Sequence, residues 1–94
     1  MQTPQQLTET LMRQSAEFGH LSDELADILD TKAVKWVELR KEHKSDTATE
    51  RAWQATPEGM RETRVKLSLK KLEKQMSAIK THLKTLSDEA HNMY

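Results

Sequence analysis

The sequence has no cysteine and very little glycine, proline or aromatic residue. Two glycines and two prolines occur, and aromatic residues make up 4% of the chain. Without cysteine there can be no disulfide, thiolate nucleophile or cysteine-based zinc site. Strand proteins need turn residues at short intervals and β-branched or aromatic runs, so their scarcity argues against a β fold. No P-loop and no Gly-x-Gly-x-x-Gly motif occurs.

The chain also lacks an overall charge and any long apolar run. Fifteen basic and fifteen acidic residues give a formal net charge of zero, so there is no general attraction to polyanions or membrane surfaces. No apolar stretch approaches the roughly 20 residues of a membrane span. The first ten residues, MQTPQQLTET, are polar and predict neither a signal peptide nor a transit peptide. We therefore expect a soluble, cytoplasmic protein with no membrane partner.

The residues that are abundant favour long helices. Charged residues make up 32% of the 94 positions, and Ala, Leu, Glu, Lys, Gln and Met are frequent. We expect a single domain over residues 1–94. Thr3 and Pro4, with Gln6 at the capping-box position, predict the start of a helix over residues 4–44. The stripe of apolar residues along this helix is interrupted at Lys32 and Lys35. These two lysines occupy positions where the three- and four-residue spacing of the stripe, the seam of the helix, would place apolar residues.

A connection is predicted over residues 45–56. It has room for one short helix, because Thr47 and Glu50 have capping-box spacing, and Ala48, Ala52 and Trp53 could then face inward. The pair formed by Thr56 and Pro57 repeats the earlier start signal and predicts a second long helix over residues 57–92.

The second long helix carries the most specific pattern of the sequence. Aliphatic residues recur in alternating steps of four and three over four heptads, at Val65, Leu69, Leu72, Met76, Ile79, Leu83, Leu86, Ala90 and Met93. A sustained seven-residue repeat predicts left-handed supercoiling against another helix. We take Val65 to Leu86, together with Trp36 and Trp53, as the predicted core and interaction seam.

These patterns predict an all-α fold, an antiparallel coiled-coil-like hairpin of two long helices. The stretch Asp23 to Asp30 is acidic and the stretch Lys70 to Lys80 is basic, and in a hairpin we expect the two to lie close together. A lone hairpin leaves some apolar residues off the seam, namely Leu29, Trp36, Val37 and Leu67. We therefore expect a homodimer that forms a four-helix bundle. The alternative is a monomer in which the connection covers this surface.

Trp36 and Trp53 stand out in a chain so poor in aromatic residues. We favour the interpretation that both close the loop end of the hairpin. The alternative is that they are interface hot spots, in which tryptophan is enriched.

Two carboxylate–histidine pairs, Glu17 with His20 and Asp88 with His91, have spacings that resemble those of di-iron helical bundles. In a hairpin they would lie at about the same height, but the seam turns them away from the interior. We expect solvated side chains rather than ligands, and therefore no metal site and no cofactor. Serines in the helical segments lack a nucleophile elbow, so no catalytic residue is predicted and the chain is not expected to be an enzyme.

The basic stretch between Arg61 and Lys84 is the best candidate for a binding surface. A basic helix face can contact phosphates, and the candidate contacts for nucleic acid are Arg61, Arg64, Lys70, Lys71, Lys74 and Lys84. Neutralisation by the acidic first helix and the absence of interleaved aromatic residues weigh against it. We favour a solvated face with intramolecular pairing and keep nucleic-acid binding as the alternative.

The second half of the chain resembles small helical proteins encoded by tailed bacteriophages and prophages. The resemblance covers residues 36–94 and rests on Trp36, Leu39-Arg40, Ala52-Trp53-Gln54-Ala55-Thr56-Pro57-Glu58-Gly59, residues 66–71 and residues 72–81. It implies an accessory protein that acts in the cytoplasm of an infected bacterium, and it carries over no catalytic residue. Combined with the patterns, it predicts a non-enzymatic module that binds a host or phage macromolecule.

Overall fold

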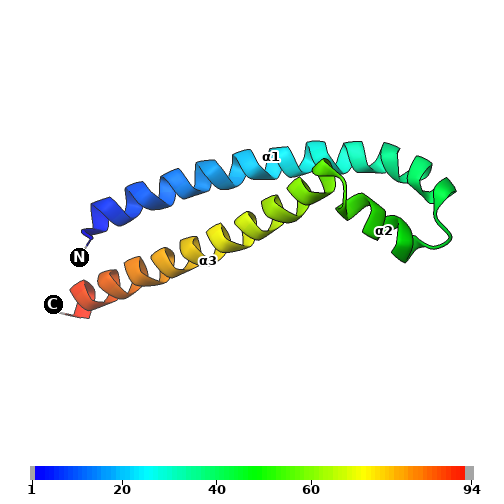
Figure 1. Cartoon of the computed structure of the whole chain (residues 1–94). Helices are drawn as coiled ribbons and strands as arrows, with labels where there is room; N and C mark the ends of the chain where they lie inside the picture. The colour runs from blue at the N-terminus through cyan, green and yellow to red at the C-terminus, as the bar shows by residue number, and fades with distance from the viewer. Residues whose placement is uncertain (1, 93–94) are drawn as a thin grey trace.

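The chain folds into three helices that form an elongated hairpin. The computed structural model describes residues 2–92, and its principal extents are 68 × 20 × 18 Å. Two long helices, α1 (Pro4–Glu42) and α3 (Pro57–Asn92), run antiparallel, and the short α2 (Asp46–Gln54) connects them. Figure 1 shows α2 lying beneath the far end of α1, while the start of α1 and the end of α3 lie at the opposite end of the hairpin. The predicted all-α hairpin is thus confirmed.

Helix α1 begins at the predicted capping box. The backbone N–H of Gln6 donates to the Thr3 hydroxyl at 3.2 Å, and the Thr3 N–H donates to the Gln6 side chain at 2.9 Å. The helix continues through Gly19 and ends at Glu42, two residues before the predicted end. The guanidinium of Arg40 donates to the carbonyl of His43 at 2.7 Å, which satisfies a carbonyl where the helix stops.

Helix α2 exists as predicted, but its cap is different. Ser45 is the N-cap residue, and its hydroxyl accepts the N–H of Ala48 at 3.1 Å. The predicted capping box of Thr47 with Glu50 is therefore wrong, because the helix begins before Thr47. Serine and threonine both cap helices by the same hydrogen bond, and serine is the better of the two, so the sequence contains two possible helix starts close together.

Helix α3 begins at the predicted Thr56–Pro57 signal. The Thr56 hydroxyl accepts the N–H of Gly59 at 3.0 Å and donates to the carbonyl of Trp53 at 2.6 Å. One side chain therefore caps α3 and satisfies the end of α2. This fixes a tight reversal between the two helices.

The register of the hairpin differs from the predicted one. Gln14 contacts Gln75 at 3.2 Å, Glu24 pairs with Arg61 at 2.7 Å, and Lys35 pairs with Glu58. The stretch Asp23 to Asp30 thus lies beside the first turns of α3 rather than beside Lys70 to Lys80. The reason is α2, which packs against the end of α1, so that α3 can begin only where α2 leaves α1 uncovered.

The core is small, and its largest fully buried side chain, Trp53, lies where the three helices meet. The buried apolar side chains among the described residues are Leu7, Trp53, Val65 and Leu72, and Trp53 is 0% exposed. Val65 and Leu72 belong to the predicted seam and are buried. Toward the chain ends the seam is only half-buried at Met76, Ile79, Leu83 and Leu86, and Ala90 is exposed. Met93 lies outside the described residues.

Candidate functional site

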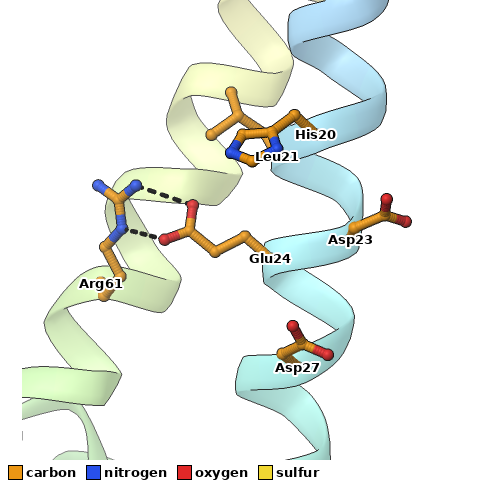
Figure 2. Close-up of a pocket in the computed structure, with 6 residues that line it drawn as sticks. All are labelled: His20, Leu21, Asp23, Glu24, Asp27 and Arg61. Atoms are coloured by element: carbon orange, nitrogen blue, oxygen red, sulfur yellow. Dashed lines mark hydrogen bonds and ion pairs between the residues drawn. The ribbon is translucent and has the colours of Figure 1, made fainter.

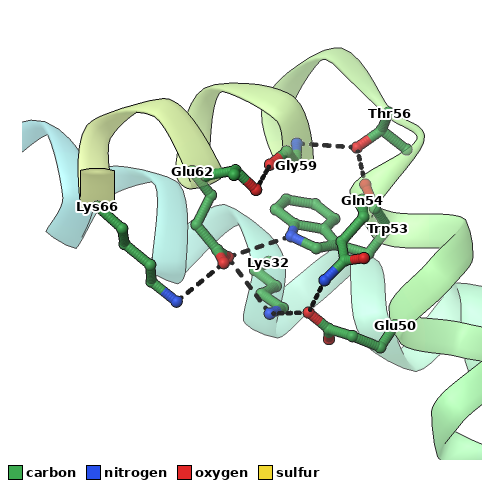
Figure 3. A network of polar contacts seen from close by, with 9 residues as sticks. Lys32, Glu50, Trp53, Gln54, Thr56, Gly59, Glu62 and Lys66 are labelled. Atoms are coloured by element: carbon green, nitrogen blue, oxygen red, sulfur yellow. Dashed lines mark hydrogen bonds and ion pairs between the residues drawn. The ribbon is translucent and has the colours of Figure 1, made fainter. Parts of the chain in front are cut away.

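The closed end of the hairpin holds a partly buried polar cluster that joins all three helices. The carboxylate of Glu62 on α3 accepts the indole N–H of Trp53 on α2 at 3.1 Å. It also binds the ammonium of Lys32 on α1 at 3.3 Å and that of Lys66 at 3.0 Å. Lys32 further binds Glu50 on α2 at 3.2 Å. Figure 3 shows these groups converging around the indole ring. We call Lys32, Glu50, Trp53 and Glu62 the junction cluster.

The charges of the junction cluster are stabilised despite their burial. Burial raises the pKa of Glu62, but hydrogen bonds from Lys66, Lys32 and Trp53 outweigh it and hold the pKa below its usual 4.5. Burial lowers the pKa of Lys32, but hydrogen bonds to Glu50 and Glu62 outweigh it and keep the pKa above 10.5. The Lys32 ammonium also lies 5.7 Å from the ring centroids of both Trp36 and Trp53, within cation–π range.

The junction cluster was not predicted as a unit from the sequence. Lys32 and Lys35 were placed on the seam of α1, and a lysine is rarely buried without a partner. Stepping the α3 seam backwards from Val65 by three and then four residues gives Glu62 and Glu58. These are the carboxylates that bind Lys32 and Lys35. The sequence therefore held a signal for this pairing, which becomes readable once α2 is known to turn the chain there.

The two tryptophans lie at the closed end of the hairpin. Trp53 is fully buried against α3, whereas Trp36 on α1 is half-buried. The favoured interpretation of Trp53 as a residue that closes the loop end therefore agrees with its position. The ring of Trp36 lies beside the junction cluster, with its centroid 5.7 Å from the Lys32 ammonium.

The six candidate nucleic-acid contacts divide into two groups. Arg61 is engaged within the chain, since its guanidinium forms two hydrogen bonds with Glu24 at 2.7 and 2.8 Å. The other five make no ion pair with any residue in the range 2–92, and all are exposed; they are Arg64, Lys70, Lys71, Lys74 and Lys84. The acidic residues of α1 therefore do not neutralise this surface through direct pairs.

The Glu24–Arg61 pair spans the side of the hairpin. It lines a surface depression together with His20, Leu21, Asp23 and Asp27. Figure 2 shows Glu24 reaching across to Arg61, whereas the carboxylate of Asp23 points away from α3. The hydrogen bond from Arg61 lowers the pKa of Glu24, and Glu24 raises the pKa of Arg61. Arg61 is exposed and Glu24 is half-buried, and a pair this open to solvent contributes more to the choice of register than to the stability of the fold.

The carboxylate–histidine pairs do not meet. Ser15 contacts Met76, which sets Glu17 and His20 near the middle of α3. Asp88 and His91 lie beyond Leu86, and Leu86 shares a depression with Thr3 and Pro4 at the start of α1. The expectation that both pairs lie at the same height is therefore wrong. All four side chains are exposed. Between residues 2 and 92, no three His, Cys, Asp or Glu side chains are grouped as a metal would require.

Comparison with known proteins identifies no relative of this chain. No protein-family model, no curated protein and no solved structure matches it. Within residues 2–92, every helix is too short or too polar to cross a bilayer.

Proposed function

We propose that this chain is a non-enzymatic interaction module that self-associates and binds another macromolecule through exposed helix faces. The observation that carries the proposal is the amount of surface left in water. The chain exposes 7280 Å². A compact monomer of the same mass, 10.9 kDa, would expose about 5,600 Å². Part of the excess is the half-buried seam of the two-helix end, which a second hairpin can cover to form a four-helix bundle.

Light scattering coupled to size-exclusion chromatography tests self-association. We expect a mass of about twice that of the chain at high protein concentration, because a stable dimer needs only roughly 800 Å² from each partner. Ile79→Asn, which places an amide in the seam, should weaken the dimer. Thr81→Asn is the matched control, since Thr81 is exposed on the same helix. A strict monomer at every concentration would reject the bundle.

The partner within this proposal is a host or phage protein in the cytoplasm of an infected bacterium. The support is the resemblance of residues 36–94 to small helical proteins of tailed phages. The apolar side chains of Met60 and Leu67, 54% and 61% exposed on α3, offer a contact surface. Affinity capture from infected cells should yield a partner that Leu67→Glu loses. A partner captured equally well by the substituted chain would contradict the assignment of this surface.

A specific observation favours nucleic-acid binding as a second candidate function. Five basic side chains of α3, unlike Arg61, make no ion pair in the part of the chain that is described. Gel-shift titrations at rising salt provide the test, because release of counterions makes phosphate binding fall steeply with salt. We expect the triple substitution of Lys70, Lys71 and Lys74 by Gln to abolish binding. Lys41→Gln, on exposed α1 surface, should not. Absence of binding at low ionic strength would reject this candidate.

A further inference from the structure

Two oppositely charged faces lie on opposite sides of the hairpin. The acidic outer face of α1 consists of Asp23, Asp27, Asp30 and Val34, and the basic outer face of α3 consists of Leu67, Lys70, Lys71 and Lys74. All eight residues are exposed, with Val34 at 73% and Leu67 at 61%. Val34 lies two residues from Lys32 and from Trp36, which are both half-buried and lie over one another at the junction cluster, so Val34 points to the opposite side of α1. Leu67 has the same relation to Val65 and Leu69 on α3.

The charges on both faces are free to bind something else. Within the described residues, the carboxylates of Asp23, Asp27 and Asp30 make no ion pair, and neither do the three lysines. The register explains why. The hairpin brings Glu24 rather than its acidic neighbours to α3, and there it meets Arg61. The pairing of the acidic and basic stretches that the sequence suggests is therefore not made inside one chain.

We propose that copies of this chain stack on one another, with the acidic outer face of α1 in one copy packed against the basic outer face of α3 in the next. The inference rests on the proposed role as an interaction module, and it names a second copy as one partner. The contact is charge-complementary around an apolar centre formed by Val34 and Leu67.

An antiparallel alignment of the two faces makes the charges match. With Val34 opposite Leu67, the step back of four residues to Asp30 meets the step forward of four residues to Lys71, with Lys70 beside it. Steps of seven residues bring Asp27 opposite Lys74. The parallel alignment places Asp27 opposite Met60 and sets Lys41 against Lys74. Charge matching thus selects the antiparallel contact.

The arrangement of the faces also sets the symmetry. Because the two faces lie on opposite sides of one hairpin, a single two-fold contact cannot use both. The contact joins unlike surfaces, so each added copy leaves one acidic and one basic face open, and the assembly can continue. It differs from the seam-mediated bundle, which is closed. Its exposed ion pairs make it sensitive to salt, since the Debye length falls to about 3 Å at 1 M ionic strength.

Disulfide trapping tests the register, and the chain has no cysteine of its own to interfere. Val34→Cys protein mixed with Leu67→Cys protein should form a disulfide between chains in a glutathione buffer at low salt. Val34→Cys mixed with Ala78→Cys is the matched control, because Ala78 is exposed on α3 but lies roughly 16 Å further along. Equal yields for the two mixtures, or yields unchanged at 1 M salt, would overturn the stacked contact.

Charge reversal separates this contact from the other proposals. The Asp27→Lys/Asp30→Lys protein and the Lys71→Glu/Lys74→Glu protein should each lose salt-sensitive association by at least about tenfold. A mixture of the two should regain it, with circular dichroism confirming unchanged helix content in both. Salt-sensitive association that survives the aspartate reversal would refute stacking. If every variant forms only a salt-insensitive dimer, with no salt-sensitive association beside it, stacking is refuted. The proposed four-helix bundle would still stand in that case.

Discussion

At the scale of single residues, Glu62 is the charged group that is buried within residues 2–92. It is 5% exposed and receives hydrogen bonds from three side chains on three helices. We expect Glu62→Gln to lower the free energy of unfolding by about 2 kcal/mol, because the partly buried Lys32 ammonium loses one of its two counter-charges. Urea unfolding at neutral pH and fixed protein concentration measures this loss.

The control for this substitution is Glu73→Gln. Glu73 is an exposed glutamate on the same helix and makes no ion pair within residues 2–92. Its substitution should change the stability by less than about 0.5 kcal/mol. Equal effects of the two substitutions would show that the junction cluster does not stabilise the fold.

The two glycines give a second prediction at the residue scale. A Cβ on Gly59 would lie 1.9 Å from the Trp53 carbonyl oxygen, whereas a Cβ on Gly19 would meet nothing within 4 Å. Gly59→Ala should therefore destabilise the fold by about 2 kcal/mol or more, since rigid backbone must move. Gly19→Ala should stabilise it by roughly 0.5–1 kcal/mol, because alanine favours a helix interior. Thermal unfolding of both variants decides the matter, and shifts of the same sign would contradict the close approach of α3 to α2.

At the scale of elements, the junction cluster couples α2 to the two long helices. The pKa of Glu62 is lower in the folded state, so its contribution to stability is present above about pH 4.5 and is lost as the pH falls through the folded pKa. The pKa of Lys32 is raised, so its contribution is present at neutral pH and is lost only as the pH rises above 10.5. In acid, Lys32 therefore stays charged after its partner Glu62 becomes neutral.

We expect acid to release α2 before the long helices unfold. Trp53 reports on this step, because it is fully buried and donates to Glu62. In a Trp36→Phe background, the fluorescence of Trp53 should shift to the red below about pH 4.5 while the circular dichroism of helix remains. In the Glu62→Gln variant, the fluorescence of Trp53 should be shifted to the red already at neutral pH. Coincident loss of both signals would contradict a separate release of α2.

The helices also show which features could be predicted from short sequence patterns and which could not. The start signals at Thr3–Pro4 and Thr56–Pro57 each act through hydrogen bonds within one turn, and both were predicted correctly. The cap of α2 was placed at Thr47 rather than Ser45, because two capping residues lie close together. The predicted register of the hairpin was wrong. The register depends on how α2 packs against α1, and neither a cap nor a heptad pattern encodes that contact.

At the scale of the whole molecule, burial of the α3 seam decreases along the hairpin. Val65 and Leu72, in the half of α3 nearer α2, are 1% and 6% exposed, whereas Ile79 and Leu83, nearer the end of α3, are half-buried. In the monomer we expect amide hydrogens of residues 79–86 to exchange at least roughly tenfold faster than those of residues 62–72. Hydrogen-exchange mass spectrometry at low protein concentration measures the ratio. Uniform protection along α3 under monomeric conditions would contradict it.

The sequence by itself determined the helices, their main start signals and the apolar stripe of α3, because caps and heptads act over a few neighbouring residues. It also placed Lys32 and Lys35 on the seam of α1 without their partners. Only the tertiary structure decided that Glu62 and Glu58 bind them, that Gly59 must lack a side chain, and that the acidic and basic outer faces point apart. These features depend on where α2 packs, and a contact between helices distant in the sequence leaves no fixed spacing along the chain.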